Sequence, residues 1–234
     1  MSRFAIGRPV RRRSRVRAFN GETASRALRE GGFGPGREVF GFNKGQFSVI
    51  DLIEAALGHT GPAHATICTW TAANADLKRT AQFMREGRML SARWLVDYTF
   101  ETRQPQFCQL LRELFGDEAI RTTACHAKFV LLRAAEWRVV VQSSMNLNQN
   151  KRIENFWVCD DPELFAAYDA LVSDVFGVQA TGEGFGAKPK VRRAELAALG
   201  AESEGADGMA GPQHFVGLCE PHLEIQTAIL PGDE

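Results

Sequence analysis

Apolar and polar residues alternate along the middle of the chain in blocks that predict strands and helices in turn. Short apolar runs bounded by charged or turn residues predict strands. These runs cover residues 38–42, 65–71, 89–100, 129–132, 137–142 and 156–159. Between them, apolar residues recur every three or four positions, which predicts amphipathic helices. The helical stretches cover residues 47–57, 75–87, 105–115 and 162–176, and Gly58 is expected to end the first of them.

This alternation predicts an α/β domain in which helices cover a central sheet. The domain is expected to occupy residues 37–177. Residues 1–36 predict a basic, flexible tail, because glycines crowd its last six positions. Residues 178–234 predict a linker followed by an acidic extension, with four basic and nine acidic residues.

Composition and charge place the chain among soluble globular proteins. Of its 234 residues, 44% are hydrophobic and 24% are charged, which allows a sizeable buried core. No apolar run approaches the roughly 20 residues of a membrane span, and no signal-peptide core follows the first arginines. The five cysteines are scattered and odd in number, which favours reduced thiols. We therefore expect a cytoplasmic protein.

The formal net charge is zero, yet residues 1–19 hold seven arginines and no acidic residue. Arginine beside phosphate releases counterions, so this arm predicts sequence-independent binding of nucleic acid. A solubilising tail is an equally good interpretation. The arginines proposed to bind nucleic acid are Arg11, Arg12, Arg13, Arg15 and Arg17.

The candidate chemistry lies around two neighbouring strands. His126 and Lys128 stand two residues apart before one strand, and Ser144 and Asn146 stand two apart after the next. Alternate residues of an extended segment share a face, so each pair is expected to point the same way. An imidazole, an ammonium, a hydroxyl and an amide would then meet in one place. That set suits a phosphate, whose oxygens the cation and donors hold while His126 attacks phosphorus.

These residues resemble the HKD motif of the phospholipase D superfamily. His-x-Lys, an apolar strand, a second strand, Ser-Ser-x-Asn and a following Glu-Asn match the motif at His126, Lys128, Ser144, Asn146 and Glu154. The resemblance covers roughly residues 46–176. It departs at Arg133, where the family usually has aspartate, and at Ser143, which replaces a common glycine.

The resemblance implies a phospholipase D-like layered α-β-α domain with a mostly parallel or mixed central sheet. It also implies a two-step phosphodiesterase reaction through a phosphohistidine, without a metal ion or another cofactor. Lys128 and Asn146 would hold the nonbridging oxygens, while Ser144 and Glu154 would orient the histidine. Because no other histidine has a lysine two residues on, the second imidazole is expected from a twofold dimer.

Nucleic acid, with DNA favoured over RNA, is the expected substrate because the chain has an arginine-rich arm and no membrane element. The main alternative is a catalytically weak or inactive nucleic-acid-binding protein of the same fold, which Arg133 in place of aspartate would favour. A zinc site is disfavoured because Cys219 and His222 lack two further ligands. Trp70 is expected either to pack in the core or to line a groove beside the site.

Overall fold

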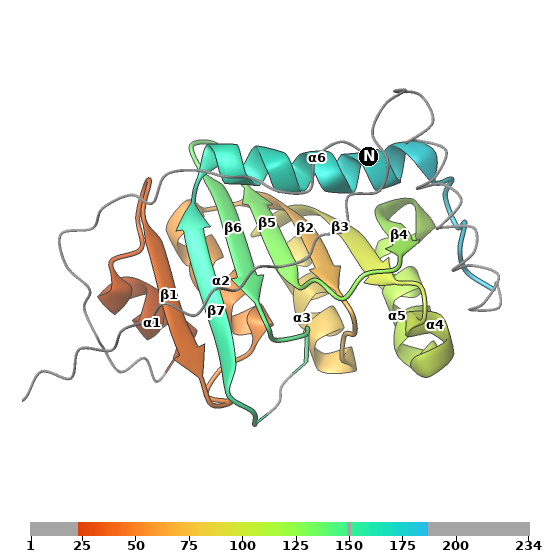
Figure 1. Ribbon diagram of the computed structural model, residues 1–234, viewed down its shortest axis with the longest axis horizontal. Coiled ribbons are helices and arrows are strands. Elements are labelled where there is room, and N and C mark those ends of the chain that lie inside the picture. The colour runs from red at the N-terminus through yellow and green to blue at the C-terminus, as the bar shows by residue number, and fades with distance from the viewer. Residues whose placement is uncertain (1–22, 149–150, 187–234) are drawn as a thin grey trace, which may run out of the picture.

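The computed structural model describes residues 23–148 and 151–186, and within them seven strands form one sheet. The strands are β1 (Glu38–Asn43), β2 (Ala63–Thr69), β3 (Met89–Asp97), β4 (Ile120–Thr123), β5 (Phe129–Arg133), β6 (Arg138–Ser143) and β7 (Glu154–Asp160). They lie in the order β1-β7-β6-β5-β2-β3-β4 (Figure 1). Strands β2, β3 and β4 are parallel, and the other neighbours are antiparallel. The sheet is therefore mixed rather than mostly parallel.

Helices cover both faces of this sheet. They are α1 (Ala24–Gly31), α2 (Val49–Thr60), α3 (Asn74–Arg85), α4 (Phe100–Arg103), α5 (Pro105–Phe115) and α6 (Pro162–Val178), with a 3-10 turn at Asp117–Ala119. Figure 1 shows α6 crossing the strands on one face, while α2 and α3 lie behind the sheet. Successive strand residues follow this division: Val139 and Val141 pack on the α2 side, and Val140 packs with α6. The predicted layered α-β-α domain is confirmed.

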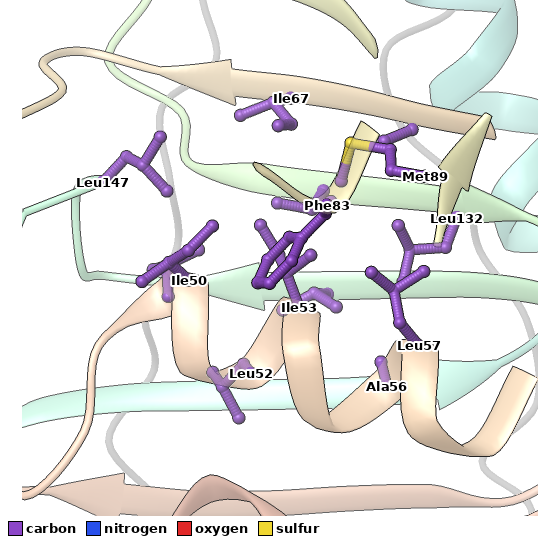
Figure 2. Close-up of a cluster of buried hydrophobic side chains, with 14 of the residues drawn as sticks. Ile50, Leu52, Ile53, Ala56, Leu57, Ile67, Phe83, Met89, Leu132 and Leu147 are labelled. Atoms are coloured by element: carbon purple, nitrogen blue, oxygen red, sulfur yellow. The ribbon is translucent and has the colours of Figure 1, made fainter. Parts of the chain in front are cut away.

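Helix α2 anchors the larger core. Ile50, Ile53 and Leu57 project toward the sheet, where Ile67 and Leu132 meet them (Figure 2). At its start, the carboxylate of Asp51 accepts a hydrogen bond from the Ser48 backbone at 2.7 Å, and this caps the helix. The predicted end at Gly58 is wrong, because the helix continues to Thr60. One interior glycine costs only about 1 kcal/mol, and the left-handed φ of 71° falls at Gly61 instead.

The expected boundary at residue 36 is also wrong, because residues 23–36 fold with the domain. Helix α1 is capped by Thr23, whose hydroxyl accepts from the Arg26 backbone at 3.2 Å. Its side chains Ala24, Ala27 and Leu28 are buried in the core. The glycines that suggest a flexible joint instead include the left-handed cap Gly32, with a φ of 72°. The arginine arm lies outside the described residues, as do residues 187–234.

At the other boundary, Gln179 immediately follows α6 and is buried against β4. Its side-chain oxygen accepts from the Thr122 backbone at 2.8 Å, and its side-chain nitrogen donates to the Thr122 carbonyl at 2.9 Å. The folded part therefore continues past the expected end at residue 177. Within the described residues, no helix is both long and apolar enough to cross a membrane.

Strand register brings distant segments to one end of the sheet. Phe129 of β5 pairs with Gln142 of β6 and with Cys68 of β2, while Ser143 pairs with Phe156 of β7. The segment before β5, the segment after β6, the start of β7 and the segment after β2 consequently emerge side by side. They carry the candidate residues.

Candidate active site

His126 and Lys128 contact each other at this end of the sheet, in an extended segment that precedes β5. The Lys128 ammonium lies 3.0 Å from Nδ1 of His126 and 3.3 Å from Nε2, and it donates to the His126 carbonyl at 2.7 Å. His126 is exposed and Lys128 is half-buried. The imidazole is thus open to a substrate, with a cation beside it.

Ser144 and Glu154 form the second pair. The Ser144 hydroxyl donates to the Glu154 carboxylate and accepts from the Asn155 backbone at 3.0 Å. Ser143, which stands where the resembled motif commonly has glycine, donates through its hydroxyl to the Asn155 carbonyl at 2.7 Å and accepts from the Met145 backbone at 3.0 Å. This departure from the motif therefore ties the end of β6 to β7.

Two observations join the His-x-Lys segment to the Ser144–Glu154 pair. The Ser143 backbone donates to the Lys128 carbonyl at 3.2 Å, so the two segments are neighbours. Burial lowers the pKa of Lys128, while the negative charges of Cys125 and Glu154 act in the opposite direction. Lys128 therefore lies within electrostatic reach of Glu154.

Asn146 lies on the segment that crosses from β6 toward β2. The next residue, Leu147, donates its backbone N–H to the Thr71 carbonyl at 3.2 Å and accepts from the Ala73 backbone at 2.8 Å. The side-chain oxygen of Asn146 is buried and has no hydrogen-bond partner among the described residues. The segment is thus held firmly, while one amide oxygen stays unsatisfied.

Trp70 and Arg103 also belong to this end of the sheet. The Trp70 ring centre lies 5.4 Å from that of His126. The Arg103 guanidinium carbon lies 3.6 Å from the Trp70 ring centre, and Arg103 donates to the Trp70 carbonyl at 2.8 Å. Trp70 is only partly buried. Trp70 therefore lies beside His126 and not within the buried core, and nothing in the motif indicates Arg103.

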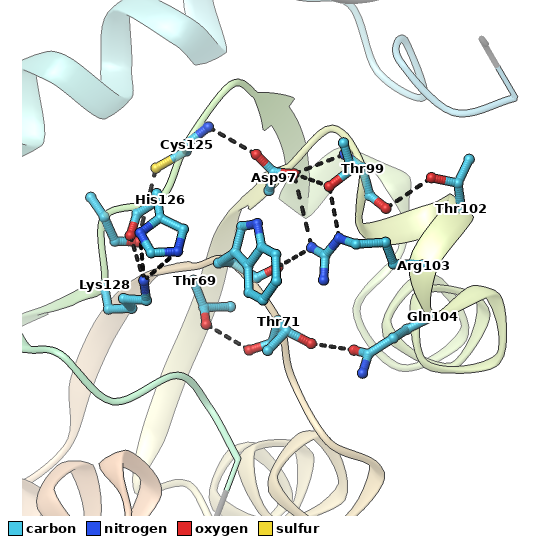
Figure 3. A network of polar contacts seen from close by, with 12 residues as sticks. Thr69, Thr71, Asp97, Thr99, Thr102, Arg103, Gln104, Cys125, His126 and Lys128 are labelled. Carbon is cyan, nitrogen blue, oxygen red and sulfur yellow. Dashed lines mark hydrogen bonds and ion pairs between the residues drawn. The ribbon is translucent and has the colours of Figure 1, made fainter. Parts of the chain in front are cut away.

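Asp97, the last residue of β3, holds the segment that leads into His126. Its buried carboxylate accepts from the Cys125 backbone at 3.1 Å and from the Thr99 backbone at 3.0 Å, and it lies 3.9 Å from Arg103. Figure 3 shows Cys125, His126 and Lys128 along one segment, with Asp97 and Arg103 across from them. The motif does not indicate Asp97.

Arg133 lies at the opposite end of β5 from Lys128. Its guanidinium donates to the Asp169 carboxylate of α6 at 2.6 Å, and Arg93 of β3 donates to the same carboxylate at 2.7 Å. The position where the family usually has aspartate is therefore an ion-pair position away from His126.

A second imidazole does not reach His126 from the described residues. His64 lies near the start of β2, where its Nδ1 is 2.8 Å from the Ser91 hydroxyl, and His59 packs edge-on against Phe33. The described residues also contain no group of three or more His, Cys, Asp or Glu side chains placed to hold a metal ion. Cys219 and His222 lie outside the described residues.

Comparison with known proteins finds no matching family model and no matching curated protein. Among solved structures, the chain is similar to the phospholipase D family member Nuc from Salmonella typhimurium, with a TM-score of 0.46 and 14% identity, over 60% of this chain and 94% of that one. It is also similar to polyphosphate kinase from Porphyromonas gingivalis, with a TM-score of 0.47 and 11% identity, over 63% and 27% of the two chains. NucT from Helicobacter pylori has a TM-score of 0.46 and 11% identity, over 60% and 97%.

Proposed function

We propose that the protein is a phosphodiesterase, and specifically a nuclease, in which His126 attacks phosphorus. The contact between the Lys128 ammonium and the His126 imidazole carries the proposal, because a phosphate bound beside this nucleophile would have a cation within reach of its oxygens. The Ser144–Glu154 pair at the same end of the sheet supports it.

The reaction has two steps. An imidazole nitrogen of His126 forms a bond to phosphorus while the bond to the leaving oxygen breaks, and a second imidazole gives that oxygen its proton. Water then attacks the phosphohistidine and releases the product, with the second imidazole taking the proton of the water. Lys128 and Asn146 hold the nonbridging oxygens throughout. Glu154, through Ser144, keeps the surroundings of the histidine in place.

The second imidazole comes from another copy of the chain. Within residues 23–148 and 151–186, His59 and His64 are held elsewhere, so these residues supply His126 as the one imidazole at the site. A twofold axis beside His126 would bring the two copies of this residue together, because an isologous interface pairs a patch with itself. The active form is therefore a homodimer.

Nucleic acid is the proposed substrate, and DNA is favoured over RNA. The seven arginines of residues 1–19 supply a charge that a phosphate backbone would attract. The exposed face of His126 suits a diester within a long chain, which cannot enter a closed cavity.

Incubation of the purified protein with single-stranded DNA, double-stranded DNA, RNA and a bis-aryl phosphate, each with and without EDTA, tests the proposal. We expect cleavage of DNA and of the bis-aryl phosphate, because the imidazole and the ammonium do the chemistry. Binding of nucleic acid without cleavage of any substrate would instead support the non-catalytic binding protein. Cleavage that EDTA abolishes would contradict the metal-independent mechanism.

A further inference from the structure

Two thiols meet directly behind the segment that carries His126. Cys68 is the penultimate residue of β2, and Cys125 immediately precedes His126. Their sulfur atoms lie 3.3 Å apart, although the two residues are 57 positions apart in the chain. A disulfide requires about 2.05 Å between the sulfurs, so a shift of roughly 1 Å would join them.

The two thiols differ in their exposure and in their chemistry. Cys68 is buried, whereas Cys125 is partly exposed. The hydrogen bond from Cys68 lowers the pKa of Cys125 to about 7, helped by Lys128 and opposed by burial and by Asp97. The same hydrogen bond, together with burial, raises the pKa of Cys68 well above its ordinary range. At neutral pH, Cys125 is therefore the thiol of the pair that ionises to a large extent, while Cys68 keeps its proton.

This asymmetry matches what a reactive pair requires. The thiolate is the form of cysteine that attacks, and a neighbouring thiol can then resolve the oxidised product. Among the other described cysteines, Cys108 is buried on α5, and burial raises its pKa to about 12. Cys108 is thus an unreactive thiol for comparison.

We propose that Cys68 and Cys125 form a redox modification site, which a hydroperoxide converts reversibly into a disulfide that switches off the neighbouring site. The existence of the disulfide stands on the two thiols alone, whereas the switch rests on the proposed phosphodiesterase function.

The chemistry balances with hydrogen peroxide as the oxidant. The Cys125 thiolate attacks one peroxide oxygen, the O–O bond breaks, and the released oxygen takes a proton to leave as water. The Cys68 sulfur then attacks the sulfenic sulfur, the S–O bond breaks, and the Cys68 proton leaves with the hydroxyl as a second water. Two thiols and one peroxide give one disulfide and two waters.

Closure of the disulfide would displace His126. Cys68 is fixed in β2, where it pairs with Leu95 of β3 and Phe129 of β5. Cys125 lies outside the strands, where its backbone N–H donates to Asp97 and its sulfur contacts Cys68 and the Ala127 carbonyl. The segment with Cys125 and His126 must therefore make most of the movement, which carries the imidazole away from its position beside Lys128.

Peptide mapping of the intact, reduced chain tests the disulfide without any need for activity. The protein is treated with a small excess of hydrogen peroxide, its remaining thiols are alkylated, and it is digested with trypsin without reductant. Residues 45–78 and residues 122–128 are tryptic peptides with one cysteine each. We expect them to appear joined, with the mass of two hydrogen atoms missing, and to separate on reduction with dithiothreitol.

Matched variants identify the thiols. Cys68→Ser and Cys125→Ser should each abolish the joined peptides, whereas Cys108→Ser should retain them. Alkylation of both cysteines after peroxide treatment, or oxidation of Cys125 to sulfinic acid without any joined peptide, would overturn the proposal.

The rate of bis-aryl phosphate hydrolysis tests the switch. We expect the rate to fall by up to roughly 100-fold as the joined peptides accumulate, because a displacement of about 1 Å suffices for such a loss, and to recover on reduction. Peroxide should leave the rate of Cys125→Ser unchanged. A joined pair with an unchanged rate would overturn the switch. A joined pair in a protein that never cleaves diesters would overturn the phosphodiesterase and the switch, but not the modification site.

Discussion

The Arg103 guanidinium carbon lies 3.6 Å from the centre of the Trp70 ring, and the same ring lies 5.4 Å from that of His126. A cation this close to an indole face is held by the quadrupole of the ring. Arg103 also donates a hydrogen bond to the Trp70 carbonyl at 2.8 Å, which holds the Trp70 backbone as well as its ring. Trp70 is therefore restrained by α4 and in turn limits where the His126 ring can lie.

Trp70→Ala should lower diester hydrolysis by roughly 10- to 100-fold, mainly through kcat, because His126 loses a neighbour that positions it. Trp70→Phe keeps an aromatic ring and should recover most of the rate. Steady-state measurement of kcat and KM on the bis-aryl phosphate distinguishes this from a general loss of fold, which would lower the active fraction of both variants. Equal rates for the wild type and Trp70→Ala would remove Trp70 from the site.

His126→Ala should reduce hydrolysis by at least roughly 10²- to 10⁴-fold, because the nucleophile is lost. Lys128→Ala should act similarly, because charge on the nonbridging oxygens loses its counterion. His64→Ala is the matched control, since His64 lies near the far end of β2 and contacts Ser91. Circular dichroism should show all three variants folded. A folded His126→Ala protein with full activity would refute the catalytic role.

The proposed shared site predicts a homodimer. Light scattering coupled to gel filtration should give about twice the chain mass of 25.9 kDa, because two copies of His126 are needed for one reaction. A protein that is strictly monomeric at assay concentration and still cleaves diesters would rule out the shared site. An inactive monomer would favour the nucleic-acid-binding protein instead.

Deletion of residues 1–19 should weaken nucleic-acid binding and reduce its dependence on salt. Each phosphate contact contributes roughly 0.7–0.9 to the slope of log affinity against log salt, so the loss of several arginines should flatten that slope measurably. Fluorescence anisotropy with labelled DNA over a series of salt concentrations gives the slope. If full-length and truncated proteins give the same slope, the arm is a solubilising tail.

Asp76→Asn should stabilise the protein at neutral pH. Burial, together with the nearby Asp51 charge, raises the pKa of Asp76 to about 6, against the opposing effect of Arg79. Because the folded protein holds this proton more tightly than the unfolded chain, the stability it contributes is present below about pH 4 and lost as pH rises through 6. Urea unfolding should show that Asp76→Asn increases the free energy of unfolding by about 1–3 kcal/mol more at pH 7 than at pH 4.

Asp51→Asn provides a control, because its effect on the free energy of unfolding should change with pH in the opposite direction. Although burial acts to raise the pKa of Asp51, its hydrogen bonds with Ser48 and Arg79 hold that pKa below the ordinary value. The stability from Asp51 is therefore present at neutral pH and lost in acid, so Asp51→Asn should be most destabilising near pH 7. A pH-independent gain for Asp76→Asn would contradict the raised pKa of Asp76.

The layered fold could be predicted from hydrophobic periodicity, because strands buried on both faces and amphipathic helices leave clear patterns. Residues 105–115 form α5 with the predicted bounds. The predictions failed at glycines, because a glycine can lie inside a helix, cap its end or belong to a flexible segment. Gly58 continues a helix, and Gly32 caps α1 instead of loosening a tail. Only packing decides such cases, as the burial of Leu28 in the core illustrates.

Only the part of the site formed by residues close together in the sequence could be predicted from their spacing. His126 and Lys128 are neighbours in an extended segment, so a spacing of two was informative. The approach of Trp70, Asp97 and Arg103 depends on the register of β2 and β3 and on the turn into α4. Those contacts join residues that lie roughly 20 to 60 positions from His126, so the sequence left two places open for Trp70 and did not indicate Asp97 or Arg103.

The antiparallel pairing of β5 with β6 determines which lengths of chain the site can tolerate. Phe129 pairs with Gln142 and Arg133 pairs with Arg138. Lys128 and Ser143 therefore both lie just beyond the last residue pair of β5 and β6. One residue added within either strand would turn the following side chains to the other face of the sheet. Residues added between 133 and 138 would only lengthen a loop at the far end. Sequences that keep this chemistry are therefore free to differ in the number of residues between Lys128 and Ser144, provided that the difference falls in the turn.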